Sequence, residues 1–511
     1  MLEIQKWLSN SFYALLALPA TAMGFALSVQ IAALSWILST QYGLDIHDVG
    51  LVWAAGPIAG IIGQILIGVI SDNVWFWNGR RRPFILIGGV LSALMLLALP
   101  NIGIISSAMG LDGILGIALV VALTLDLAIN VSFNPTRSII ADVTPEGRPR
   151  TKGYTWMQTV SGTFGVMAYA IGAIWDNFVL IYFGVALVLL FSLLPPFFIK
   201  EPWVLGQDDE DESRADLTPE AAGVSAQQHA GDAAKKSNEA SLIEIVKVIY
   251  PLWGFFIYSV YALAVRLGMA AIPGNIFEYA CLVLTILLIG KAIFTSEEGK
   301  SKEKAGMIGF QKVLAAHSFT WVGVQSMFIY LYAFVQYRMD YLTDIAVGQT
   351  VNWSFFSLNL VAAIIPALLL EPIAARYGRV NTHMTCIAIM AAGYTAIIFF
   401  GFTPVMLYAL FAIVGIGWAA TISLPFAIMS SKIPRNRMGL YMGLFNLSVV
   451  LPQLVASLGV GEAVSGIEDK SLIFIICAVT VGFSALSWSF VKEKKEEVLG
   501  SAAVIGGGSG H

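Results

Sequence analysis

Residues 113–140 read GILGIALVVALTLDLAINVSFNPTRSII. The stretch exceeds the ~20 mostly apolar residues that an α-helix needs to cross a bilayer. It carries one carboxylate, Asp126, near its middle. The stretch therefore predicts a membrane-spanning helix with an ionisable group inside the membrane.

Similar apolar runs occur on both sides of this stretch, in groups of six, two and six. With the first stretch they lie near 13–39, 49–71, 83–100, 113–140, 154–175, 178–199, 246–265, 270–290, 317–337, 350–371, 381–401, 404–430, 440–459 and 471–491. Only 12% of the 511 residues are charged, whereas soluble domains have about 25%. We expect an all-α polytopic membrane protein: two six-helix bundles (6+6) with two extra membrane helices between the halves.

We divide the chain into five segments. They are an N-terminal six-helix bundle (1–200), an acidic cytoplasmic linker (201–245), an extra helix pair with a charged cytoplasmic segment (246–312), a C-terminal six-helix bundle (313–495) and a tail (496–511). The linker begins EPWVLGQDDEDESRADLTPE. It has too few large apolar residues to bury a core, so we expect it to be disordered. The tail ends in GGGSGH and resembles an appended flexible linker.

Lys and Arg gather in the loops on one side of the predicted spans. If every run crosses once, that side carries Arg80, Arg81, Arg82, Arg148, Arg150, Lys152, Arg376, Arg379, Lys432, Arg435, Arg437, Lys492, Lys494 and Lys495. Short loops rich in Lys and Arg stay in the cytoplasm. We therefore expect both termini to be cytoplasmic, in a protein of the plasma (inner) membrane.

Two short motifs recur in the two halves. YGR at 377–379 matches NGR at 78–80, and Pro434-x-x-Arg437 matches Pro145-x-x-Arg148. Each pair follows the second or the fourth helix of its half. Parallel six-helix repeats are one way in which transporters build alternating access around a site at the middle of the membrane.

The motif after the second span resembles the cytoplasmic signature of the major facilitator superfamily. It consists of Gly68, Asp72, Gly79, Arg80, Arg81 and Arg82. We interpret it as a conformational latch, in which charge pairs break when the two halves rock. The alternative is that these charges only set the topology.

Longer stretches are similar to the plant sucrose/proton symporters and their animal and bacterial relatives. These are WAAGPIAG (53–60), SDN (71–73), GRRRPFI (79–85), LD (125–126), ISLPFA (422–427) and GLFN (443–446). The resemblance covers both halves and implies proton-coupled sugar symport. The chain departs from these relatives in its extra helix pair, and in a longer loop that holds Trp75 and Trp77.

Three polar residues of the stretch 113–140 are candidates for the transport site. A carboxylate at this depth usually marks an ion or proton pathway. Arg137 follows Asp126 by eleven residues, so both face one side of the helix, roughly 16 Å apart. The resemblance implies that Asp126 binds the coupled proton and that Arg137 assists coupling or organises the substrate. Asn130, one turn from Asp126, is a candidate for binding sugar or holding the carboxylate. Each residue has a structural alternative. Asp126 would be satisfied by a neighbouring helix, Arg137 would reach to the membrane interface, and Asn130 would make an interhelical hydrogen bond.

Sugars are recognised by planar amides and acids, with aromatic faces against the apolar side of the ring. The candidates for substrate binding are Gln30, Gln64, Asn130, Gln158, Trp321, Gln325, Trp353, Asn359, Trp418, Asn446 and Gln453. Each is also consistent with helix packing. His47 lies in the first outer loop, where the symporters carry a histidine near the outer entrance; an ordinary loop histidine is the alternative.

We expect a monomeric proton-coupled symporter of sucrose, maltose or a related glycoside. Its coupling ion is the proton, with no other cofactor, no metal and no nucleic-acid partner. The alternative is a proton-driven exporter of a drug or metabolite on the same fold. An enzyme is not expected, because the sequence has no Gly-rich phosphate loop, no DxD-type metal site in a loop near the membrane and no HExxH motif. The acidic run from Asp208 to Glu212 falls in the predicted disordered linker, where we expect solvated charges. A non-transporting sensor remains a further alternative because of the large central insertion.

Overall fold

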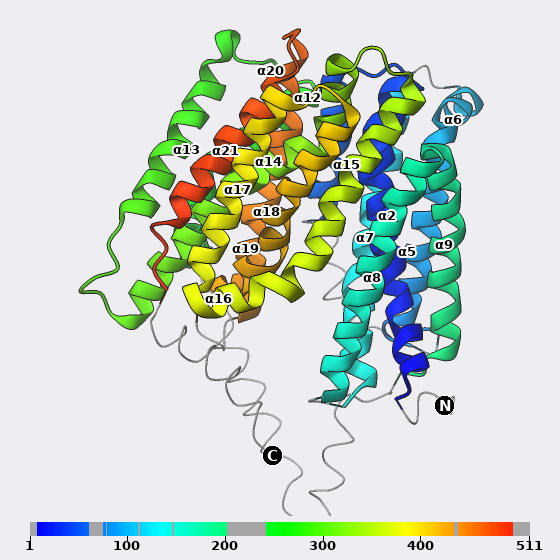
Figure 1. Ribbon diagram of the computed structural model, residues 1–511, viewed down its shortest axis with the longest axis horizontal. Coiled ribbons are helices and arrows are strands. Elements are labelled where there is room, and N and C mark those ends of the chain that lie inside the picture. Colours follow the sequence, from blue (N-terminus) through cyan, green and yellow to red (C-terminus); the bar gives the residue numbers. More distant parts are fainter. Residues whose placement is uncertain are drawn as a thin grey trace, which may run out of the picture.

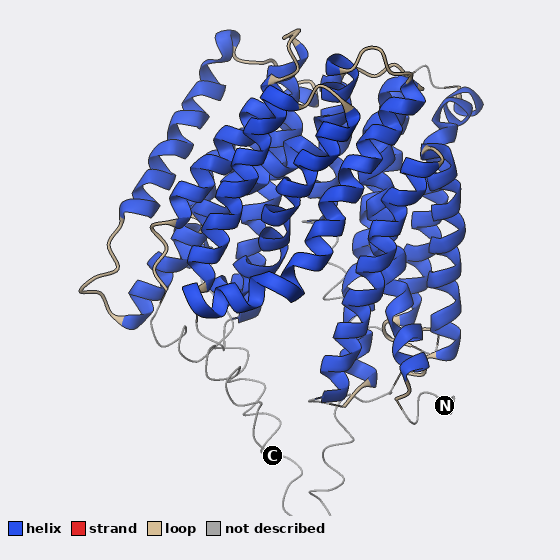
Figure 2. Cartoon of the chain, viewed as in Figure 1, coloured by secondary structure: helices blue, strands red, loops and turns tan. Residues whose placement is uncertain are grey.

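The computed structural model describes residues 8–60, 75–77, 79–110, 113–145, 148–201, 242–433 and 438–493. Within these ranges the regular secondary structure is helical and there is no strand (Figure 2). The predicted all-α class is confirmed. Most of the predicted linker, 202–241, and the tail 496–511 lie outside the described residues.

The N-terminal half is built from long helices that run between the two ends of the bundle and from shorter helical elements. They are α2 (Asn10–Thr40), α3 (Ile46–Trp53), α5 (Arg82–Ala98), the turn η1 (Leu99–Asn101), α6 (Ile102–Met109), α7 (Ile114–Val143), α8 (Arg148–Ile174) and α9 (Asn177–Phe198). Short polar side chains mark where these helices begin. Ser9 Oγ accepts from the N–H of Phe12 at 3.2 Å, and Asp176 Oδ1 from that of Val179 at 2.8 Å. The first N–H groups of a helix have no partner within it, so such caps favour these starting points.

The helices of the C-terminal half repeat this arrangement with two interruptions. They are α14 (Lys302–Arg338), α15 (Asp344–Ile365), η4 (Pro366–Leu370), α16 (Glu371–Tyr377), α17 (Arg379–Phe400), α18 (Pro404–Ser430), α19 (Met438–Val455), η6 (Ala456–Val460), α20 (Gly461–Ser465) and α21 (Leu472–Trp488). The elements η4 and η6 are single π-helical turns. Single π-helical turns inside α-helices are frequent at functional sites.

The two halves lie side by side (Figure 1). We call the end that carries Arg80–Arg82 and Arg379 the basic end. The opposite end, where α2 ends at Thr40 and α15 begins at Asp344, is the far end. In Figure 1 the halves come together at the far end, at the top, and their ribbons diverge towards the basic end.

An extra helical segment packs against the C-terminal half. Its elements are α11 (Leu242–Val248), η2 (Tyr250–Leu252), α12 (Trp253–Arg266), η3 (Pro273–Asn275) and α13 (Ile276–Phe294). Thus α11 starts a few residues before the predicted end of the linker, and Val248 is buried. Helix α12 contacts α13, α19 and η6, while α13 also contacts α14 and lies at the edge of the molecule (Figure 1). Gly254 allows the α12–α13 contact, because a methyl group there would lie 2.0 Å from Thr285 Oγ1.

Nine helices within the described residues are long and apolar enough to cross a membrane. Helices α8 and α15 are not among them. These two pack against each other across the halves. Because they face protein as well as lipid, they need not be apolar all round. The outer face of α13 carries large exposed apolar side chains such as Leu282 and Leu287, as a lipid-facing helix would.

Hydrogen bonds join the two halves towards the far end. Ser35 Oγ of α2 donates to the carbonyl oxygen of Ile329 on α14, at 2.7 Å. Trp36 Nε1 donates to the carbonyl oxygen of Asp344 at the start of α15, also at 2.7 Å. These side chains are buried, so the bonds are shielded from competing water.

Glycines allow the backbones of the halves to approach at this end. Asn352 Nδ2 on α15 donates to Asn177 Oδ1 on α9 at 2.7 Å. A methyl group at Gly172 would lie 2.5 Å from Asn352 Oδ1, and one at Gly348 would lie 2.7 Å from Asn177 Nδ2. Larger residues at these glycines would therefore push the halves apart.

Candidate functional site

A cavity of about 300 Å³ lies between the two halves, midway along the helices. We call it the central cavity. It is lined by Leu27, Gln30, Ile31, Trp53, Gly56, Pro57, Gly60, Asp126, Ile129, Asn130, Phe133, Trp321, Gln325, Phe328, Trp418, Asn446, Val449, Val450 and Gln453. Both halves contribute, which is the arrangement expected for a site exposed to each side in turn.

Helical periodicity explains why these side chains share the cavity. On α7, Asp126, Asn130 and Phe133 are spaced four and three residues apart. Trp321 and Gln325 have the same four-residue spacing on α14. Residues three and four apart lie on one face of a helix, so each helix presents one mixed polar and aromatic face to the cavity.

Asp126 is the carboxylate of the central cavity. It is 6% exposed, and Gln30 Nε2 of α2 donates to its Oδ2 at 2.9 Å. Among the described residues no Lys, Arg or His lies within ion-pair distance of Asp126. Gly56 leaves room beside it, since a methyl group there would lie 3.3 Å from Oδ2. A buried carboxylate without a cationic partner can gain a proton without breaking an ion pair.

Two amides accompany this carboxylate. Gln30 Oε1 is buried and has no hydrogen-bond partner among the described residues. It is therefore an available acceptor beside Asp126. Asn130 Nδ2 donates to the carbonyl oxygen of Asp126, one turn back, at 2.8 Å. Asn130 is thus held by its own helix while it lines the cavity.

The C-terminal half supplies a second set of amides and an aromatic wall. Gln453 Nε2 donates to Gln325 Oε1 at 3.1 Å. The indole rings of Trp321 and Trp418 meet edge to face, with centroids 5.9 Å apart, and Trp418 meets Phe328 in the same way at 5.4 Å. Amides beside aromatic faces can bind a ligand that has both hydroxyl groups and an apolar ring surface.

Other predicted substrate residues do not line the central cavity. Gln158 is exposed on α8. On α15, the ring of Trp353 contacts Phe356, and Asn359 Nδ2 donates to the carbonyl oxygen of Phe355 at 2.9 Å. Gln64 lies outside the described residues.

The structure adds residues that were not candidates from the sequence. Phe133 and Phe328 line the cavity with the predicted polar residues. Each stands seven residues after a candidate, Asp126 and Trp321 respectively. That two-turn spacing is a signal that could have identified both.

Arg137 lies one turn beyond the cavity, towards the basic end. Its guanidinium carbon is 4.2 Å from the ring centroid of Phe133, which lines the cavity. Its side chain is exposed and is not part of the cavity lining. Arg137 and Asp126 therefore lie on the same helix at different depths.

The arginine motif pairs within the N-terminal half. Arg81 Nε donates to Asp142 Oδ2 at 3.0 Å. The carboxylate of Glu201, which follows α9, accepts from the backbone N–H groups of Arg80, Arg81 and Arg82 at 2.7–2.8 Å. A carboxylate at a helix N-terminus is favoured by the helix dipole. Gly68 and Asp72 of the predicted latch lie outside the described residues, and Gly79 directly precedes these N–H groups.

The C-terminal half carries the equivalent pairing. Glu493, which follows α21, accepts from the N–H groups of Arg379 and Val380 at 3.1 Å each. Gly378 has φ of 90° at this point, a conformation that favours glycine. The GR repeat seen in the sequence thus marks the same contact in both halves. Pro434 and Arg437 of the second repeat lie outside the described residues.

His47 contacts the extra helix pair at the far end. Its Nδ1 lies 2.6 Å from Glu462 Oε2 of α20 and 2.7 Å from a guanidinium nitrogen of Arg266 on α12. That nitrogen of Arg266 is 3.1 Å from Glu462 Oε2. The cluster joins the N-terminal half, the extra pair and the C-terminal half.

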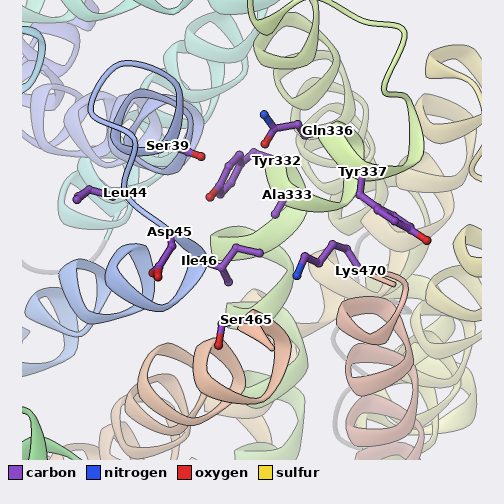
Figure 3. A pocket seen from close by; sticks show the side chains of 10 residues that line it. All are labelled: Ser39, Leu44, Asp45, Ile46, Tyr332, Ala333, Gln336, Tyr337, Ser465 and Lys470. Atoms are coloured by element: carbon purple, nitrogen blue, oxygen red, sulfur yellow. The ribbon is translucent and has the colours of Figure 1, made fainter. Parts of the chain in front are cut away.

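A second cavity, of about 360 Å³, opens at the far end. Figure 3 shows Ser39 of the N-terminal half near Tyr332 of α14, with Asp45 and Ile46 on one side of the pocket and Lys470 on the other. No residue lines both this far pocket and the central cavity. Between the two lie buried contacts such as the 2.8 Å bond from Trp53 Nε1 to Ser35 Oγ. The described structure is therefore closed at the far end.

Within the described ranges, no group of three or more His, Cys, Asp or Glu side chains could hold a metal ion. The three cysteines, Cys281, Cys386 and Cys477, are buried and unpaired.

Curated proteins similar to this chain include sugar transporters. The sucrose transport protein SUC4 of Arabidopsis thaliana is 24% identical over 484 residues, which cover 86% of this chain and 82% of that protein. The general alpha-glucoside permease of Schizosaccharomyces pombe is 29% identical over 32% of this chain and 31% of its own length. The human proton-associated sugar transporter A is 32% identical over 30% of this chain and 21% of its own length.

Solved structures share the fold at low sequence identity. The nucleoside transporter NupG superposes with a TM-score of 0.58 and 12% identity, covering 95% of this chain and all of that one. The peptide transporter POT in complex with sulfate superposes with a TM-score of 0.59 and 14% identity, covering 97% of this chain and 95% of its own. The sequence profile of the Major Facilitator Superfamily matches residues 16–459. The predicted fold is confirmed, and this integral membrane protein belongs to the Major Facilitator Superfamily.

Proposed function

We propose that this chain is a proton-coupled sugar symporter that binds a disaccharide, such as sucrose or maltose, or a related glycoside in the central cavity. The observation that carries the proposal is Asp126, a buried carboxylate with an amide partner and no cationic partner among the described residues, in a cavity of amides and indoles. Three similar proteins, a sucrose transport protein, a general alpha-glucoside permease and a proton-associated sugar transporter, support it.

The cavity suits a sugar by size and chemistry. Its volume falls at the lower end of the range of about 300–1,000 Å³ usual for small-molecule sites. Amides of Gln325, Gln453 and Asn446 offer donors and acceptors for hydroxyl groups. The rings of Trp321 and Trp418 offer apolar surface for the C–H side of a sugar ring.

Proton and sugar would meet at one pair of side chains. When Asp126 is ionised, it accepts from Gln30 Nε2. When Asp126 is protonated, its hydroxyl group can donate, either to the free Gln30 Oε1 or to a sugar oxygen. Protonation thus changes the donors offered to the sugar. Arg137, below the cavity on the same helix and against the Phe133 ring, would assist coupling or organise the substrate, as the resemblance to the symporters implies.

Alternating access would operate on the contacts between the halves. In the state described here, the far end is closed by bonds such as Ser35 to Ile329 and Asn352 to Asn177. Opening that end would break these bonds and join the far pocket to the central cavity. With the basic end in the cytoplasm, the far pocket would be the outer entrance beside His47, and both termini would lie in the cytoplasm of a plasma-membrane monomer.

Uptake of labelled sucrose and maltose into proteoliposomes, with and without an inward proton gradient, tests this proposal. We expect accumulation above the external concentration with the gradient, and its collapse on addition of a protonophore. Empty liposomes with the same gradient are the control. Uptake that only equilibrates, with or without the gradient, would contradict proton coupling; no uptake of any glycoside would contradict the sugar assignment.

A further inference from the structure

A buried histidine lies directly behind Trp321, in the wall of the central cavity. His317 stands one turn before Trp321 on α14 and is 2% exposed. Trp321 Nε1 donates to His317 Nε2 at 2.9 Å. His317 does not itself line the cavity, so this bond links it to the ligand space through the Trp321 ring.

The bond defines the form of the histidine ring. An indole N–H can only donate, so His317 Nε2 must be an acceptor and the proton of the neutral ring must lie on Nδ1. His317 Nδ1 is buried and has no hydrogen-bond partner among the described residues. An unpartnered polar atom destabilises a buried site. An apolar residue would therefore pack better here, and the acceptor for Trp321 is what the histidine adds.

Neighbouring rings hold the imidazole in place. The His317 ring stacks on Phe445, with centroids 4.9 Å apart and an interplanar angle of 15°. The edge of Trp488 closes another side, at 6.4 Å and 79°. A ring packed in this way cannot turn freely, so its acceptor nitrogen keeps a fixed direction. Trp321 is fixed on its cavity side by the edge contact with Trp418.

We propose that His317 is a positioning residue, which fixes Trp321 as the aromatic surface against which the sugar ring packs. This inference rests on the proposed function of the central cavity. The bond turns the indole N–H away from the ligand and leaves the carbon surface of the ring to face it. Sugar hydroxyl groups are then bound by neighbouring amides, such as those of Gln325 and Gln453. His317 thereby contributes to affinity and to selectivity among glycosides.

Two replacements of similar shape separate the acceptor from the packing. His317→Gln keeps an acceptor oxygen near the position of Nε2, whereas His317→Met has a thioether, which is only a weak acceptor. His383→Met is the matched control, because His383 is also buried in this half and contacts the edge of Trp488 at 4.4 Å. His383 does not line the cavity.

We expect His317→Met to raise KM for the transported sugar about tenfold, the scale of one lost hydrogen bond. The maximal rate should stay close to that of the wild type, because turnover does not need this contact. His317→Gln should restore KM, and His383→Met should leave it unchanged. Equal KM values in the wild type and in a correctly folded His317→Met protein would overturn the proposal. So would a rise in KM of the same size in His383→Met.

A double variant tests whether His317 acts through Trp321. Trp321→Phe keeps a ring but removes the N–H. If the two residues act as one unit, adding His317→Met to Trp321→Phe should change KM no further. Independent effects that multiply in the double variant would contradict the proposal.

A readout without sugar separates this inference from the proposed function. In protein labelled with ¹⁵N-tryptophan, the indole N–H signal that is missing in Trp321→Phe belongs to Trp321. His317→Met should shift this signal upfield and speed its exchange with water, and His317→Gln should not. An unchanged signal in His317→Met would overturn the bond. By contrast, failure of the wild-type protein to transport any glycoside would count against the proposed function alone.

Discussion

Replacing Asp126 by asparagine should abolish coupling and leave the site assembled. Asn Oδ1 can still accept from Gln30 Nε2, which now bonds the carboxylate at 2.9 Å. The variant cannot take up and release a proton in the physiological pH range. We therefore expect it to exchange sugar across the membrane without concentrating it.

The magnitude follows from the number of carboxylates in the cavity. Among the described residues that line it, Asp126 is the only acidic one, so one proton should accompany each sugar. One pH unit is worth about 1.4 kcal/mol, or a tenfold concentration ratio, for one proton. With the membrane potential held at zero, the wild type should accumulate sugar about tenfold per pH unit, and Asp126→Asn about onefold.

The assay is the steady-state ratio of labelled sugar inside and outside proteoliposomes at several imposed pH gradients. Counterflow, in which unlabelled sugar inside drives entry of labelled sugar, is the control for a folded Asp126→Asn protein. Tenfold accumulation by the variant would refute the role of Asp126. A ratio of about a hundredfold per pH unit in the wild type would mean two protons, and would refute the argument from a single carboxylate.

Three further predictions concern the ends of the molecule. Gly172→Val should open the far end, because a methyl group there would already lie 2.5 Å from Asn352 Oδ1. A cysteine placed at Ile31, which lines the central cavity, should then react faster with an impermeant maleimide added at the far end. Gly162→Val is the control, because this glycine of the same helix has open space around it, and it should leave the rate of maleimide labelling unchanged. Equal labelling rates in the two variants would contradict the prediction. Glu201→Ala should lower the free energy of unfolding by about 1 kcal/mol through loss of the helix cap, and Glu493→Ala should have a similar effect. Unchanged melting temperatures in both variants would contradict this and show that water replaces the caps. Arg266→Ala should lower the free energy of unfolding by less than about 1 kcal/mol, because the side chain of its partner Glu462 is 65% exposed. A larger decrease, measured by thermal unfolding and reversed by Arg266→Lys, would show that the cluster at His47 is more strongly coupled.

The membrane architecture could be predicted from local properties of the chain. The length and the composition of an apolar run decide whether a helix can cross a bilayer. Both properties can be read directly from the sequence. The stretch 113–140 forms α7, and the GR repeats lead into α5 and α17. The sequence also singled out Asp126, because a carboxylate within an apolar run is rare enough to be informative.

The membership of the site could be predicted only in part. Polar residues in membrane helices are equally suited to packing and to binding, so the sequence could not separate Gln325 from Asn359. The direction in which each side chain points decided this. Gln325 lines the cavity, whereas Asn359 bonds to its own helix.

Composition, hydropathy and the distribution of charge therefore determined that this chain is a polytopic helical membrane protein with an ionisable group inside one of its apolar helices. Only the tertiary structure decided what surrounds that group. Gln30 and Asp126 are 96 residues apart in sequence, and Trp321 comes from the other half of the chain. Such contacts depend on how helices pack and rotate against one another, which periodicity limits to one face but does not assign to a partner.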